Sequence, residues 1–151
     1  MVEEDVIVAN PDKIREFKQI PYDVTFSQKD SILYALGVGF QQDPMNRDHY
    51  RFTNERRDDF TPFPTNCLSI VHRGVIREGD FDIPGLPEFN PMMMLHGEET
   101  IYLHKRLQPG STYIVQETYP DFIDKKTGGV LVMDAEVRNK ETNELQSVVR
   151  T

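Results

Sequence analysis

Cysteine is nearly absent from this sequence, with Cys67 the only one among 151 residues. A single thiol cannot form an internal disulfide, so a disulfide-stapled secreted fold is excluded and a reducing compartment is favoured. Long hydrophobic runs are missing too, since none approaches the ~20 residues that span a bilayer. The opening segment, Met1–Asp5, is acidic where a secretory signal would be basic. We therefore expect an aqueous compartment and no membrane partner.

Positive charge is also scarce: 17 Lys and Arg face 25 Asp and Glu, for a formal net charge of −8 at pH 7. This balance disfavours broad attraction to nucleic acid, although it allows local basic patches. Internal repeats and low-complexity segments are absent. A chain of this length is typical of one domain and buries roughly 68–70% of its unfolded surface. We therefore expect a single domain over residues 1–151 that does not bind nucleic acid.

The first half of the chain carries two helical patterns. A helix is predicted over Ser27–Gly39, because its first residue suits an N-cap, Asp30 favours the first turn and apolar residues follow at helical spacing. A short buried helix is predicted over Cys67–Val71, ending near Gly74. The intervening segment, Gln41–Pro64, is polar and longer than an idle connection needs, which makes it a candidate functional loop.

In the second half the apolar residues change to a period of two, which is typical of half-buried strands. The predicted strands are Thr100–Leu107, Thr112–Thr118 and Leu131–Arg138, with turns at Pro109-Gly110, at 125–129 and at 139–143. This pattern indicates an antiparallel meander, whose apolar face must be covered by the helices of the first half. The expected fold class is α+β. Residues 145–151 keep strand character where the chain stops, so we expect a fragment of a longer protein.

One ordered set of short segments resembles a known family. These are Ser31–Gly39, Asp43-Pro44, Phe63–Thr65, Ile83–Leu86 and above all Leu95–Glu99 followed by Asp124-Lys125. They resemble the N-terminal half of the MaoC-like (R)-specific enoyl-CoA hydratase 2 family, as in peroxisomal multifunctional enzyme type 2, from about Tyr22 to the last residue. The resemblance implies a hot-dog fold, in which a curved antiparallel sheet wraps a central helix. It also implies that this chain is the non-catalytic half of a double hot-dog hydratase, truncated at its C-terminus.

Hydration needs one group to take a proton from water and another to give one to the α-carbon, both within reach of the same small volume. In the family, an Asp-x-Asn-Pro-x-His loop of the C-terminal half supplies the two groups. The related loop here is Gly39–Asn46, and superposing its proline on the motif places Gln41 at the Asp position and Asn46 at the His position. Amides do not exchange protons usefully near neutral pH. We therefore predict no catalytic residue in this chain.

Two other residue pairs offer alternative chemistry. Asp43 with His49 would be a displaced acid/base pair, but a histidine in a polar stretch is more often a solvated surface residue. Cys67 with His72 would be a thiol nucleophile with its base, but five residues on a helix separate them onto different faces. A lone cysteine in an apolar run is more often a core residue. The four histidines show no metal-ligand spacing in sequence, so no metal site is expected.

The Leu95–Glu99 motif bears on binding. Gly97 can simply give the backbone freedom at the start of a strand. The resemblance implies more, namely that His96, Gly97 and Lys125 contact a CoA ester bound between the two halves. A glycine lets a ligand approach the backbone closely, and a lysine is a point charge suited to phosphate, although turn lysines are commonly just solvated.

A methionine run, Met92, Met93 and Met94, is the other feature of interest. Such runs usually fill gaps in a core. The resemblance instead assigns to this half a tunnel for acyl tails of different lengths, which flexible thioethers would suit. Phe60 and Phe63 are candidates for the same wall.

Taken together, the resemblance implies the substrate-binding half of an (R)-specific 2-enoyl-CoA hydratase of fatty acyl-CoA β-oxidation. Its substrates would be fatty enoyl-CoA or 3-hydroxyacyl-CoA, without a cofactor. It would act with a second, catalytic hot-dog domain, in the same polypeptide or in a partner chain, and the full protein would be a homodimer. The compartment would be the peroxisome in a eukaryote and the cytoplasm otherwise. The alternative is a non-enzymatic acyl-CoA-binding or assembly module of the same fold. A reading frame that continues past Thr151 into Asp-x-Asn-Pro-x-His would separate the two.

Overall fold

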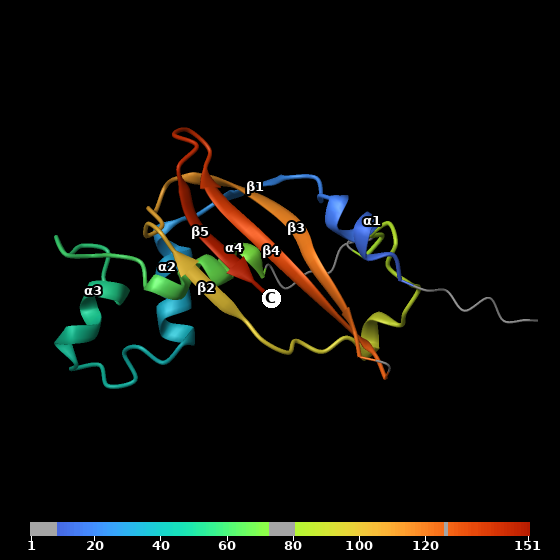
Figure 1. Cartoon of the computed structure of the whole chain (residues 1–151). Coiled ribbons are helices and arrows are strands. Elements are labelled where there is room, and N and C mark those ends of the chain that lie inside the picture. The colour runs from blue at the N-terminus through green and yellow to red at the C-terminus, as the bar shows by residue number, and fades with distance from the viewer. Residues whose placement is uncertain (1–8, 73–80, 126) are drawn as a thin grey trace, which may run out of the picture.

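The computed structural model describes residues 9–72, 81–125 and 127–151. Its centre is a five-stranded antiparallel sheet with the strand order β1-β3-β4-β5-β2 (Figure 1). The strands are β1 (Tyr22–Thr25), β2 (Thr100–Leu103), β3 (Thr112–Asp124), β4 (Gly129–Asn139) and β5 (Leu145–Arg150). The two long strands β3 and β4 form its middle, and β1 and β2 form its edges.

The predicted meander is confirmed for β3, β4 and β5, but its first step is wrong. The strand at Thr100 does not form a hairpin with β3 across Pro109-Gly110. It pairs instead with β5, where Ile101 lies opposite Val149. The reason is that β3 already has β1 on one side and β4 on the other, so the chain must pass from one edge of the sheet to the interior after β2.

The strand β3 is longer than the period-two pattern suggested. It continues past Thr118 to Asp124, with a register shift between Thr118 and Asp121. Pro120 lies at this shift, where a residue without a backbone N–H cannot contribute to the hydrogen-bond ladder. The irregularity hid the second half of the strand from a pattern that requires strict alternation.

Both predicted helices are confirmed. The helix α2 (Gln28–Gly37) begins at Ser27, whose hydroxyl accepts from the backbone N–H of Asp30 in a capping box. The second comprises a 3-10 turn, η2 (Pro64–Cys67), that continues into α4 (Leu68–Val71). Its predicted end near Gly74 lies outside the described residues. No helix in the described ranges is long and apolar enough to cross a membrane.

The main core lies between the sheet and the η2–α4 segment, on the face of the sheet where α2 also lies (Figure 1). Cys67, Ile70 and Val71 pack there against buried side chains of the sheet, which include Tyr113, Val115, Ala135, Val137 and Val149. The helix α2 buries only Ser31 and Ala35, and it leaves Leu33 and Leu36 exposed. The element that the sheet covers is therefore η2–α4, with α2 packed beside it.

A second, smaller core supports the far end of the long strands. It joins Ile14 of the short helix α1 (Pro11–Glu16) to Ile83 and Tyr119. The segment around Gly85 closes this core, because the Asn10 N–H donates to the Gly85 carbonyl at 2.8 Å. Gly85 has φ +90°, and a Cβ there would lie 2.6 Å from the Asn10 carbonyl oxygen. Only glycine fits this close approach.

Candidate functional site

The loop that follows α2 is organised around the side chain of Gln41. Its Nε2 shares its hydrogens among the carbonyl oxygens of Asp43, Pro44 and Asn46, at 3.1, 3.2 and 3.1 Å. Its Oε1 accepts from the Thr53 hydroxyl at 3.0 Å. Gln41 also has φ +62°, a left-handed conformation in which a non-glycine residue is uncommon. The amide therefore holds the loop in shape, at the position where the sequence resemblance places a catalytic aspartate.

His49 belongs to the same network. Its Nδ1 accepts from the backbone N–H of Gln41 at 3.0 Å, and its ring meets Phe40 edge-on at 4.8 Å between centroids. The Asp43 carboxylate accepts from the backbone N–H of Met45 at 2.9 Å. Within the described part of the chain, no hydrogen bond joins Asp43 to His49. A histidine acting as a general base needs a free ring lone pair, and the Nδ1 lone pair of His49 already accepts the hydrogen bond from Gln41.

The candidate functional loop is thus a small folded unit. It contains the 3-10 turn η1 (Arg47–His49) and the helix α3 (Tyr50–Thr53). Phe40, Phe52 and Phe63 form a triangle of rings with centroids 4.8 to 5.3 Å apart. Such aromatic contacts stabilise the loop from inside. Phe63, a predicted wall residue of an acyl tunnel, lies in this cluster, and Phe60 is half-buried nearby in the chain.

Cys67 is buried completely in the main core, as the sequence predicted. Burial raises the pKa of its thiol. A nucleophilic cysteine needs the opposite, a lowered pKa and access to substrate. His72 lies at the C-cap of α4, and its Nε2 contacts the Glu99 carboxylate. The thiol packs in the core while the imidazole contacts Glu99, so the two do not form a nucleophile and base.

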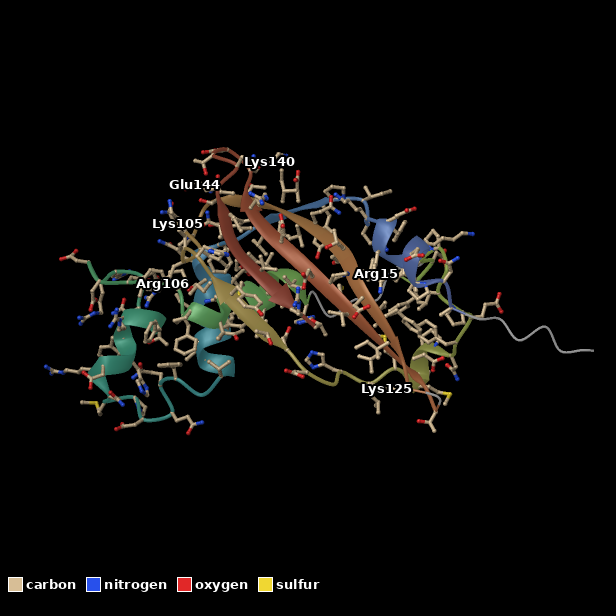
Figure 2. All side chains as sticks on the ribbon, viewed as in Figure 1. Arg15, Lys105, Arg106, Lys125, Lys140 and Glu144 are labelled. Carbon is tan, nitrogen blue, oxygen red and sulfur yellow. The ribbon has the colours of Figure 1, made fainter. Side chains whose placement is uncertain are left out.

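The three predicted CoA-binding residues lie on two elements. His96 precedes β2, and its Nε2 is 3.8 Å from Glu99 Oε2. A Cβ added at Gly97 would meet no heavy atom within 4 Å, so packing does not require glycine there. Lys125 lies in the turn between β3 and β4, where its backbone N–H donates to the Gly128 carbonyl. Figure 2 shows it at the opposite end of the sheet from Lys105 and Arg106.

The methionine run is at the surface. Met92 and Met93 belong to the 3-10 turn η3 (Pro91–Met93), and they are 88% and 78% exposed. They do not fill a gap in the core. A groove of about 540 Å³ lies elsewhere, between β1, α2 and α4. Its lining is Val24, Thr25, Phe26, Asp30, Leu33, Tyr34, Ser69 and Ile70, and it includes none of the five residues predicted to line an acyl tunnel.

The fold defines a class of protein, the α+β hot-dog domains of the MaoC-like dehydratases. In this member, side chains of the loop after α2 form hydrogen bonds within the loop. Residues 24–150 match the model of the MFE-2 hydratase 2 N-terminal domain, and the chain belongs to this family. The family and fold expected from the sequence are thereby confirmed.

Relatives of this chain include longer proteins. Peroxisomal multifunctional enzyme type 2 of Mus musculus is 33% identical over 110 residues, which cover 73% of this chain and 15% of that protein. The probable enoyl-CoA hydratase 2 of Dictyostelium discoideum is 28% identical over 135 residues, which cover 86% of this chain and 42% of that protein. The chain therefore spans less than half the length of these relatives.

Two solved structures show the same fold. A MaoC-like dehydratase from Phytophthora capsici superposes with a TM-score of 0.73 at 26% identity, over 92% of this chain and 46% of that one. The HadBC (3R-hydroxyacyl-ACP dehydratase) complex of Mycobacterium tuberculosis shares the fold, with a TM-score of 0.64 at 15% identity over 91% of this chain and 93% of that one. A domain of this size thus occurs both within longer chains and as a chain of a complex.

Proposed function

We propose that this chain is the substrate-binding half of an (R)-specific 2-enoyl-CoA hydratase of fatty acyl-CoA β-oxidation. The observation that carries the proposal is the state of the loop after α2. Its Gln41 amide and His49 Nδ1 are both engaged in holding the loop together, in a chain that belongs to a hydratase family. The proton transfers of hydration then require an acid and a base from elsewhere.

A second hot-dog domain is the proposed source of that pair, in the same polypeptide or in a partner chain. The lengths of the relatives and the HadBC complex support both arrangements. Exposed apolar side chains provide surface for such a partner on α2 (Leu33, Leu36) and on the segment before β2 (Met92, Met93, Leu95). Neighbouring exposed apolar side chains are typical of interaction surfaces. We further propose that the complete protein is a homodimer.

The CoA ester is proposed to contact His96, Gly97 and Lys125. His96 is 54% exposed and available to a ligand. Gly97 leaves open space that a side chain would occupy, which favours close approach of a ligand to the backbone. The Lys125 side chain is exposed, and its ammonium is a point charge suited to phosphate.

The acyl tail is proposed to lie against Met92, Met93 and Met94, whose flexible thioethers suit chains of different length. Phe60 and Phe63 would contribute from the loop after α2. Hydration adds water across a double bond without oxidation, so no cofactor is needed for fatty enoyl-CoA or 3-hydroxyacyl-CoA. Relatives from Mus musculus and Arabidopsis thaliana are named as peroxisomal. We accordingly propose the peroxisome in a eukaryote and the cytoplasm otherwise.

The test is steady-state kinetics of the complete two-half protein carrying His96→Ala or Lys125→Ala. Loss of one hydrogen bond to a ligand costs about 1 kcal/mol, so KM should rise about fivefold while kcat stays nearly constant. Lys125→Ala should also reduce the salt sensitivity of KM, because a screened charge contact has been removed.

The matched controls are His104→Ala and Lys105→Ala, since both side chains are exposed and Lys105 lies at the other end of the sheet (Figure 2). Neither should change KM. A collapse of kcat in His96→Ala, at unchanged KM and thermal stability, would place this half in the chemical step and contradict the proposal.

A further inference from the structure

Two histidines and one carboxylate converge on a point that the sequence does not reveal. His72 ends α4, while His96 and Glu99 lie in the segment that leads into β2. The Nε2 atoms of the two rings face different oxygens of the same carboxylate: His72 contacts Oε1, and His96 lies 3.8 Å from Oε2. The rings themselves meet edge to face with centroids 5.9 Å apart.

The geometry points to a metal site, and we propose that His72, His96 and Glu99 bind a divalent transition-metal ion such as Zn²⁺. One potential ligand atom from each residue lies within 4.8 Å of the other two, the one such group among the described residues. Tetrahedral zinc with bonds of about 2.0–2.2 Å brings its ligand atoms to within about 3.4 Å of each other. The widest of these separations therefore has to shorten by roughly an ångström, whereas the contact between His72 and Glu99 has to lengthen to admit the ion.

The side chains of this cluster have room for such a movement. The two imidazoles are 43% and 54% exposed, so their rings can turn without displacing core side chains. Glu99 is the fixed member, with an 18% exposed side chain next to a strand whose first residue, Thr100, pairs with Arg150. The site therefore has one anchored ligand and two adjustable ones.

The donor chemistry favours transition metals over Mg²⁺ and Ca²⁺. Imidazole nitrogen suits Zn²⁺, Ni²⁺ and Cu²⁺, whereas Mg²⁺ and Ca²⁺ prefer sets made only of oxygen. The polar contacts of the Glu99 carboxylate in the described ranges are with histidines, with no lysine or arginine among them. Imidazole binds metal in its neutral form, so the three ligands together carry the single negative charge of the carboxylate, which a divalent cation offsets.

The experiment is a calorimetric titration of the tag-free chain with Zn²⁺ in a non-chelating buffer, repeated with Co²⁺ while its visible absorption is followed. We expect one equivalent of Zn²⁺ per chain and a cobalt spectrum that differs from that of the aqueous ion. His72→Ala, His96→Ala and Glu99→Gln should each weaken binding at least about tenfold, since even outer-shell changes cost 10–100-fold.

The matched controls are His104→Ala and Glu98→Gln, which change exposed residues of the same types outside the cluster. Both should bind as the unaltered chain does. Should His72→Ala fail to fold, the two substitutions before β2 decide. The proposal is overturned if the unaltered chain takes up no Zn²⁺, or if the variants of all three ligands bind it as tightly as the controls do. His96 enters both proposals, but the titration contains no CoA ester, so its outcome does not depend on the proposed function.

Discussion

Gln41 is the residue whose environment most directly separates a binding half from a catalytic one. Its amide contacts three carbonyl oxygens and the Thr53 hydroxyl. Gln41→Ala removes this amide from a half-buried site and leaves its partners without it. We expect the substitution to lower the free energy of unfolding by about 1–2 kcal/mol. Urea unfolding of the chain measures this loss.

The control is Gln42→Ala, which removes the same side chain from the exposed neighbouring position. It should change stability by less than about 0.5 kcal/mol. If the two variants unfold alike, the Gln41 amide does not hold the loop, and its structural assignment is wrong.

The burial of Cys67 leads to a prediction about the protonation and reactivity of its thiol. Its thiol is buried in the core, and burial raises its pKa above the ordinary value. A thiol whose pKa is raised on folding adds stability below the pKa of the unfolded chain and loses it as pH rises through the folded pKa. We therefore expect the native thiol to stay protonated at pH 8 and to react with a disulfide reagent at least about tenfold more slowly than in urea. Equal rates in both conditions would show that the thiol is accessible.

At the scale of elements, the start of α2 depends on Ser27. Its hydroxyl accepts from the Asp30 N–H at 3.2 Å, while the Asp30 carboxylate accepts from the Ser27 N–H at 2.8 Å. Ser27→Ala should destabilise the chain by about 1 kcal/mol. Ser27→Thr keeps the hydroxyl and should recover most of the loss in thermal unfolding. No difference between the two variants would remove the capping box from the account of this helix.

Elements with local signals could be predicted from sequence. The helix α2, the segment η2–α4, the strands β3 to β5 and their turns each carry a cap, a period or a turn residue within the element. By contrast, α1 has six residues, too few to be stable alone, and it depends on Asn10 and on contact with Gly85 far along the chain. The pairing of β2 with β5 escaped prediction for the same reason, because it depends on which edge of the sheet remains free.

The candidate site shows the same division. The resemblance predicts amides at the acid and base positions of the loop after α2, because spacing from Pro44 places Gln41 and Asn46 there. The hydrogen bonds that occupy Gln41 could not, since they depend on its left-handed backbone. The contact between His72 and Glu99 joins positions 27 residues apart on different elements, so no local motif records it.

At the scale of the whole molecule, the sheet and η2–α4 form a complete core within this chain. The apolar side chains of α2 and of the segment before β2 nevertheless remain exposed. Exposed apolar surface of this kind is suited to pack against a second domain. The central claim is that it then supplies binding while its partner supplies the acid and the base.

The most direct measurement is the loss of enoyl-CoA absorbance with the purified chain, alone and fused to the C-terminal half of the Dictyostelium discoideum relative. The account predicts no turnover by the chain alone, because the described loop offers no free acid/base pair, and it predicts turnover by the fusion. Turnover by the chain alone that Asp43→Asn or His49→Ala abolishes would contradict it, as would a folded fusion without activity.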